Sequence, residues 1–299
     1  MGNLGNLYLG YPLTPIVQYI DYAECTLCAL TSRLSELKKF NRSDPESVRR
    51  IIVRIANDLP LGRSRTFANS FEELTNIVGL EDPYANEKDR YEKIAREIIV
   101  PRIMNASEVE LIKVAAAANS VDVPMFNYTF NEDMLIRSIN EEPIWLGTSE
   151  GELSEMVKSV RKVTYIVDNA GEFAVDSVLI SKLASHSKVT IVARLKPYET
   201  DVTYDYVKRM IKDSGVNIVN TGNRYPAFLS SEIYSNYIRE SDLVISKGVG
   251  NFEAYLESGI NHPNALFLFK VKCSPLQRML NVEFNKPIIL HSRYLNSRH

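Results

Sequence analysis

The second half of the sequence alternates short β-branched runs with helical patterns, and this alternation restricts the fold more than any other feature. The runs VTYIVD, KVTIVA, VNIVN, DLVIS, ALFLFKV and PIIL lie between residues 163 and 290. Strands that are apolar on both faces are typical of a parallel sheet covered by helices. The sequence therefore predicts a doubly wound α/β fold with a mostly parallel sheet and helices on both faces. Such folds bind ligands beyond the carboxyl ends of the strands.

The first half of the sequence has a different pattern. From about residue 20 to residue 140, apolar residues recur with helical spacing, as in IVRIANDL and YEKIAREIIVPRI. The pattern changes in PIWLGTSEGELSEM, where Gly147 and Gly151 stand. We expect a mainly helical N-terminal region over residues 1–150 and an α/β region with metal and phosphate sites over residues 151–299. The 45% of apolar residues suffice to bury a sizeable core. The alternative to two regions is one continuous domain in which both halves share a core.

Charge and hydropathy restrict the class of function. The chain has 35 Lys and Arg against 37 Asp and Glu, so it lacks the basic surface typical of nucleic-acid binding. It contains no apolar run long enough to span a membrane, and its N-terminus lacks the cationic start and apolar run of a signal peptide. We therefore expect a cytoplasmic protein that acts on a small molecule, without nucleic-acid or membrane partners. The sequence does not indicate an oligomeric state.

Short oxygen-bearing side chains stand at the ends of two predicted strands. Asp168 and Asn169 follow the run VTYIV, and Asp201 stands between KVTIVA and the next helical pattern. Their oxygens suit Mg²⁺, Mn²⁺ or a similar divalent ion, although each residue taken singly could form an Asx turn or a helix cap. Glu172 and Asp176 lie on one face of the helix that follows. Each could interact with the helix dipole or take part in proton transfer. The dipole interaction is favoured for Glu172, and both roles stay open for Asp176.

A further predicted strand, DLVISK, leads into the sequence GVGNFEAYLE. Lys247 supplies a positive charge, and Gly248 and Gly250 let backbone N–H groups approach an oxyanion. A helix that begins near Asn251 adds the positive end of its dipole. The spacing differs from that of a P-loop and from a dinucleotide-binding fingerprint. The segment predicts a phosphate-binding site, with a simple turn between strand and helix as the alternative.

The motifs VDNAGE, ETDVT, SKGVGNFE, VKC and ECTLC together resemble the metal-dependent damage-control phosphatases, and specifically their Cys-x-x-Cys-bearing subfamily I. The resemblance extends to EDPYANEKDRYEKIA and AAAANSVDVP in the helical half. It implies metal ligation by Asp168, Asn169 and Asp201. It also implies a phosphate or substrate site that contains Lys247, Gly248, Gly250, Asn251, Glu253, Asn119 and Asp122. Ala118 and Ala227 stand where the family usually has glycine, which affects the choice of substrate more than metal binding.

Three cysteines need a local explanation. Cys25 and Cys28 have helical spacing, and Cys273 follows Lys272. They are too few for a four-cysteine zinc site or a secreted disulfide framework, and buried small residues are the simplest interpretation. The resemblance matches them to the Cys-x-x-Cys and Lys-Cys motifs of the subfamily, but the sequence does not indicate their chemical role.

These observations predict a divalent-metal-dependent phosphatase in which Asp168, Asp201 and Lys247 are catalytic. Mn²⁺, Ni²⁺, Co²⁺ or Mg²⁺ would assist attack by water on a phosphate monoester of a small, possibly damaged metabolite. The resemblance suggests oxidised purine nucleotides or their precursors, phosphopantetheine derivatives, or sugar phosphates. One alternative is a Rossmann-like methyltransferase, which the absence of a glycine-rich loop after the first strand disfavours. The other is a non-catalytic metabolite or nucleotide sensor, which the complete set of metal ligands disfavours.

Overall fold

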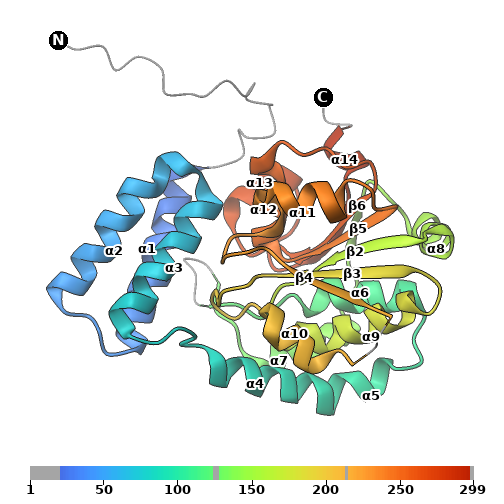
Figure 1. Ribbon diagram of the computed structural model, residues 1–299, viewed down its shortest axis with the longest axis horizontal. Helices are drawn as coiled ribbons and strands as arrows, with labels where there is room; N and C mark the ends of the chain where they lie inside the picture. The colour runs from blue at the N-terminus through green and yellow to red at the C-terminus, as the bar shows by residue number, and fades with distance from the viewer. Residues whose placement is uncertain (1–20, 124–127, 213–214, 297–299) are drawn as a thin grey trace, which may run out of the picture.

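The computed structural model describes residues 21–123, 128–212 and 215–296, and a seven-stranded sheet lies at its centre (Figure 1). The strand order is β1-β7-β6-β5-β2-β3-β4, and only the β6–β7 pairing is antiparallel. This mostly parallel sheet confirms the predicted fold class. The strands are β1 (Ile144–Leu146), β2 (Lys162–Ile166), β3 (Lys188–Ala193), β4 (Asn217–Asn220), β5 (Leu243–Lys247), β6 (Ala265–Lys270) and β7 (Pro287–His291).

Helices cover both faces of the sheet, and further helices lie beside it at one end (Figure 1). Local signals start several of them: Asp44 caps α2 by accepting from Ser47 N, and Ser107 and Glu110 form a capping box on α6. The described α-helices are α1 (Tyr22–Lys39), α2 (Pro45–Asp58), α3 (Arg63–Val78), α4 (Ala85–Ile94), α5 (Val100–Ile103), α6 (Glu108–Ala118), α7 (Glu132–Arg137), α8 (Glu150–Ser159), α9 (Glu172–Ala184), α10 (Tyr204–Met210), α11 (Ser231–Ile233), α12 (Val249–Ser258), α13 (Ser274–Leu280) and α14 (Arg293–Asn296).

Two apolar cores, one on each face, explain why the predicted strands lack alternation. Ile245 of β5 packs into the core under α6 and α9, whereas its neighbour Val244 packs into the core under α12 and α13. Both residues are therefore apolar, as successive side chains point to opposite faces. The first core also joins Ile112 to Ile289. Residues on both sides of the predicted boundary near residue 150 thus pack together, and the boundary itself stays a prediction.

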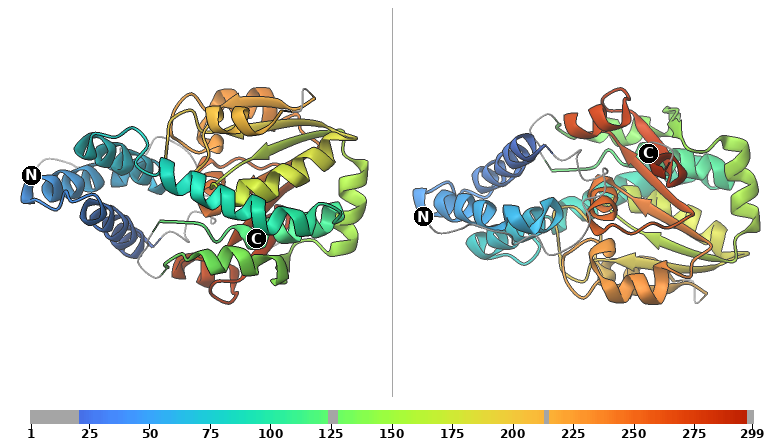
Figure 2. Two further views of the ribbon diagram at one scale, coloured as in Figure 1. Left: turned by 90° about the horizontal axis from the view of Figure 1, so that it is seen from below. Right: turned by 90° about the horizontal axis from the view of Figure 1, so that it is seen from above.

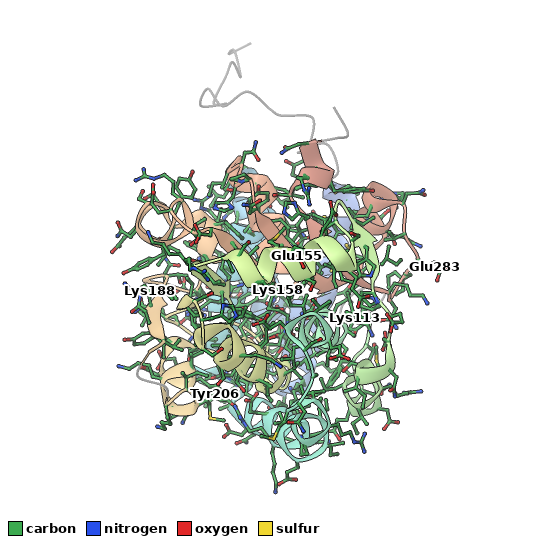
Figure 3. The ribbon with its side chains drawn as sticks, turned by 90° about the vertical axis from the view of Figure 1, so that its right-hand side faces the viewer. Lys113, Glu155, Lys158, Lys188, Tyr206 and Glu283 are labelled. Atoms are coloured by element: carbon green, nitrogen blue, oxygen red, sulfur yellow. The ribbon has the colours of Figure 1, made fainter. Side chains whose placement is uncertain are left out.

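Helices α1, α2 and α3 form a bundle beside the sheet, at one end of the molecule in both views of Figure 2. The bundle has a core of its own that includes Leu37, Ile51 and Phe71. The opposite end is covered by α8, where Glu155 and Lys158 are exposed (Figure 3). No helix within the described residues is long and apolar enough to cross a membrane. The bundle therefore lies at one end of the sheet, and the candidate site lies between the two.

Candidate active site

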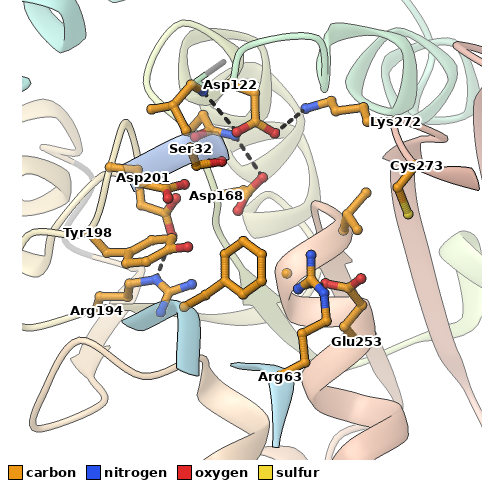
Figure 4. A pocket seen from close by; sticks show the side chains of 16 residues that line it. Ser32, Arg63, Asp122, Asp168, Arg194, Tyr198, Asp201, Glu253, Lys272 and Cys273 are labelled. Atoms are coloured by element: carbon orange, nitrogen blue, oxygen red, sulfur yellow. Dashed lines mark hydrogen bonds and ion pairs between the residues drawn. The ribbon is translucent and has the colours of Figure 1, made fainter. Parts of the chain in front are cut away.

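A cavity of about 60 Å³ lies between the bundle and the carboxyl ends of β2, β3 and β6 (Figure 4). The bundle contributes Arg63 and Phe67 to the wall of this cavity, and residues at the start of α12 complete the wall. Seven of the residues predicted from the sequence line it: Asp122, Asp168, Asn169, Asp201, Gly250, Glu253 and Cys273. Residues far apart in the chain thus converge where a doubly wound fold binds its ligand.

Two backbone hydrogen bonds fix the predicted metal ligands against one another. Val202 N donates to Asp168 O at 2.8 Å, and Ala170 N donates to Thr200 O at 2.9 Å. The segment that carries Asp201 is thereby joined to the end of β2, and Asn169 and Asp201 form a bridge. The Thr200 hydroxyl also donates to Asn169 Oδ1 at 2.6 Å. The three predicted ligands therefore lie together at the end of two adjacent strands.

Behind these residues, Asn119 and Glu172 orient them. Asn119 Nδ2 donates to Asp168 Oδ2 at 3.0 Å and to Glu172 at 2.9 Å. Asn169 Nδ2 donates to the same Asp168 oxygen at 2.9 Å and to Glu172 Oε1 at 2.8 Å. Asn119 is completely buried, so the structure places it against Asp168 and not on the wall that a substrate would touch. Glu172 was predicted only to balance a helix dipole, and its position one turn after Asp168 was the available signal.

Gly248 makes room for the Asp168 side chain. A Cβ atom on Gly248 would lie 1.9 Å from Asp168 Oδ2, and the residue has φ +79°. Both facts require glycine, because an L side chain would clash with the carboxylate and strain the backbone. Gly248 therefore shapes the predicted metal site, whereas the sequence predicted that it would approach an oxyanion.

We expect Gly248→Ala to weaken Mn²⁺ binding at least about tenfold, because the added methyl group displaces the Asp168 carboxylate. Gly250→Ala is the matched control, because nothing lies within 4 Å of a Cβ atom built there. Isothermal titration with Mn²⁺ measures both variants, and circular dichroism checks that each is folded. Equal affinities in the two variants would show that Asp168 is not a ligand.

The donor set suits a hard divalent cation. Burial raises the pKa of Asp168 well above its usual value, and the nearby charges of Asp201 and Glu172 raise it further. Burial also raises the pKa of Asp201, although the Arg194 guanidinium opposes this. Within the described residues no group of three or more His, Cys, Asp or Glu side chains is placed to hold a metal. Two carboxylates with the Asn169 amide oxygen would leave coordination positions for water or substrate.

The comparisons with known proteins identify the family of the chain. The protein-family model of the damage-control phosphatase ARMT1-like domain matches residues 22–286 of the sequence. The chain belongs to this family. The family resemblance stated from the motifs is therefore confirmed, whereas the subfamily assignment stays a prediction.

Relatives of this family member cover most of its length. A damage-control phosphatase of Pyrococcus horikoshii is 29% identical over 234 residues, which are 75% of this chain and 79% of the relative. A damage-control phosphatase of Archaeoglobus fulgidus is 28% identical over 220 residues, 69% and 74% of the two chains. The crystal structure of a DUF89 family protein from P. horikoshii matches with a TM-score of 0.74 at 26% identity, covering 90% of this chain and 98% of that one.

Lys247 does not lie where the family resemblance led us to expect it. Its ammonium group is completely buried and donates to Glu172 Oε2 at 2.8 Å and to Asp176 Oδ1 at 2.9 Å. Asp176 also accepts from Tyr165 at 2.7 Å. Lys247 thus neutralises two buried carboxylates on α9, and this geometry gives no support to its predicted contact with a phosphoryl group. Asn251, also predicted for the phosphate site, donates its amide to the backbone oxygens of Val167 and Lys247.

Lys272 lines the cavity, whereas Lys247 is not among its lining residues. The Lys272 ammonium group donates to Val121 O and to Asp122 Oδ2, both at 3.0 Å. A lysine has three N–H donors, and Figure 4 shows this one beside Asp122 and Asp168. The Lys-Cys motif was the signal in the sequence, but nothing in it indicated that the lysine faces the predicted metal ligands.

The other end of the cavity in this family member carries the ion pair between Arg63 and Glu253 (Figure 4). The Arg63 guanidinium also lies 4.2 Å from the centre of the Phe67 ring. Burial raises the pKa of Glu253 to about 7, although Arg63 opposes the shift. This pair joins the bundle to α12, so the cavity has a carboxylate-rich end and a second end where cation and anion are balanced.

The three cysteines gather near this ion pair as free thiols. Burial raises the pKa of Cys25 to about 11 and that of Cys273 to about 12. Both are therefore protonated at neutral pH, which disfavours thiolate chemistry. Cys28 is buried on α1. Their chemical role stays unassigned.

Proposed function

We propose that this family member is a divalent-metal-dependent phosphatase that hydrolyses phosphate monoesters of small metabolites, including damaged ones, by attack of water. Asp168, Asn169 and Asp201 would hold Mn²⁺, Ni²⁺, Co²⁺ or Mg²⁺. The observation that carries the proposal is the convergence of these hard oxygen donors in a buried cavity that also contains a lysine ammonium group. Membership of the family supports the phosphatase activity.

The protein's own residues have separate tasks in this proposal. A bound divalent ion would offset phosphoryl charge and lower the pKa of a water molecule. Lys272 would donate to a phosphoryl oxygen, and the Gly250 backbone, in the first turn of α12, would approach another. Asn119 and Glu172 hold Asp168 and Asn169 in place.

The Arg63–Glu253 end would contact the alcohol part of the ester. The cavity is small, which favours compact phosphate esters over large ones. Of the candidate classes, sugar phosphates are the more compact, and oxidised purine nucleotides or their precursors and phosphopantetheine derivatives are larger. A larger substrate would require the bundle to move.

Phosphate release from a panel of these esters tests the proposal. We expect turnover with Mn²⁺, Co²⁺, Ni²⁺ or Mg²⁺ and none after treatment with EDTA, and turnover should return when excess metal is added. Turnover that persists in EDTA would refute metal dependence. Metabolite binding without phosphate release would favour the sensor, and methyl transfer from an adenosyl cofactor would favour the methyltransferase, which family membership disfavours.

A further inference from the structure

A buried ion pair joins the helical bundle to the segment that carries Asp201. Arg33 of α1 is completely buried, and its guanidinium donates to Glu36 on the same helix and to Glu199, 166 residues away. The Arg33 guanidinium also lies 5.1 Å from the centre of the Phe71 ring. Glu36 accepts in addition from the Tyr84 hydroxyl at 2.8 Å. The bundle therefore holds Arg33 from several sides, and Glu199 is the partner on the sheet side.

The backbone at Glu199 has an unusual conformation that needs such support. Its φ is +41°, in the left-handed region that disfavours residues other than glycine. A backbone of this kind persists only where the surrounding contacts determine it. Glu199 is also buried, on the wall of the cavity, and its carboxylate is paired with the Arg33 guanidinium.

Two residues further along the chain, this segment positions the predicted metal ligand. Asp201 N donates to Tyr198 O at 3.0 Å, across Glu199 and Thr200. The turn is followed by the bond from Val202 N to Asp168 O. A change at Glu199 therefore reaches Asp201 through one turn of backbone.

We propose that the Arg33–Glu199 ion pair is a positioning contact by which the helical bundle holds Asp201 against Asp168 and Asn169, and so sets the affinity of the site for its divalent ion. Glu199 itself lines the cavity, but for this role it acts with Arg33 through the backbone and need not contact the ion or the substrate. The affinity part of this inference rests on the proposed function, whereas the positioning part does not.

Glu199→Gln tests the inference, because glutamine keeps an oxygen acceptor for Arg33 but removes the charge. Glu73→Gln is the control: Glu73 of α3 accepts from Arg50 of α2 at 2.6 Å, so this more exposed ion pair lies within the bundle. We expect Glu199→Gln to weaken Mn²⁺ binding about tenfold and the control to change it less than about twofold. Arg33→Lys, which keeps the charge but loses the planar fork, should lie between them.

Hydrogen exchange in the metal-free protein separates this inference from the proposed function. The amides of Asp201 and Val202 should exchange at least about tenfold faster in Glu199→Gln than in wild type. In Glu73→Gln their exchange rates should equal those of wild type. Unchanged exchange at these amides overturns the positioning role, whatever the metal affinity. If wild type binds no divalent ion, the proposed function fails, and faster exchange still supports positioning. Faster exchange with unchanged Mn²⁺ affinity overturns the link to the ion.

Discussion

Asp168→Asn is expected to lower the metal-dependent kcat/KM by at least about 1000-fold, a change in barrier of about 4 kcal/mol. The substitution preserves the shape of the side chain and keeps an oxygen that can accept from Asn119 and Asn169. It removes one of the two negative charges of the predicted donor set. Steady-state phosphate release with saturating Mn²⁺ measures the loss, and titration with Mn²⁺ should show weaker binding.

The same substitution should leave the metal-free protein at least as stable as wild type. The pKa of Asp168 is raised by burial and by Asp201 and Glu172, so its charge disfavours folding when no cation is present. Urea unfolding in EDTA measures this. Asp205→Asn is the control, because Asp205 is exposed on the first turn of α10 and should affect neither quantity. Activity above about one tenth of wild type, a barrier change of only about 1.4 kcal/mol, would remove Asp168 from the site.

Local patterns predicted the sheet well, and they also indicated the candidate metal ligands, which stay a prediction. The six apolar runs became β2 to β7, and β5, β6 and β7 are buried on both faces, whereas the edge strand β4 is only partly buried. Asp168 and Asn169 were recognisable because they follow such a run and precede a helix. The edge strand β1, only three residues long, was missed, because so short a segment has no periodicity to detect.

The direction of Lys247 depended on a contact between distant segments. Leu243 and Ile245 face the core under α9, so Lys247, two residues on, faces the same helix. The sequence also showed that Glu172 and Asp176 share a helix face, but it could not show that this face packs over β5. The glycines after Lys247 favoured a phosphate site because they are locally typical of one.

The contacts between bundle and sheet had no sequence signal at all. Arg33 and Glu199 are ordinary charged residues in their own segments, and only the fold pairs them across 166 positions. Lys272 belongs to the Lys-Cys motif, but the motif does not indicate its partner Asp122, which is 150 positions away. The pairing of such residues depends on the positions of α1 and β6 in the fold, and no local sequence pattern determines these positions.

Substituting each of the two lysines by methionine should give opposite results, and this comparison decides which one serves the phosphoryl group. Lys272→Met should lower kcat/KM about 100-fold, about 2.7 kcal/mol, because a charged donor to the phosphoryl oxygens is lost. Its Mn²⁺ affinity should be unchanged or tighter, because a cation near Asp168 is removed. The remaining Asp122 side chain is partly exposed, so water can replace the lysine as its partner.

Lys247→Met should mainly affect stability. It leaves Glu172 and Asp176 buried beside one another without their cation, and breaking such a buried pair costs about 3–5 kcal/mol. Urea unfolding of both variants, with phosphate release measured in parallel, makes the comparison. If Lys247→Met stays as stable as wild type and loses turnover while Lys272→Met keeps it, the phosphate site belongs to Lys247. Because Glu172 also accepts hydrogen bonds from Asn119 and Asn169, some loss of metal affinity in Lys247→Met agrees with the structure. The stability of Lys247→Met therefore separates a structural role of Lys247 from a role in the phosphate site.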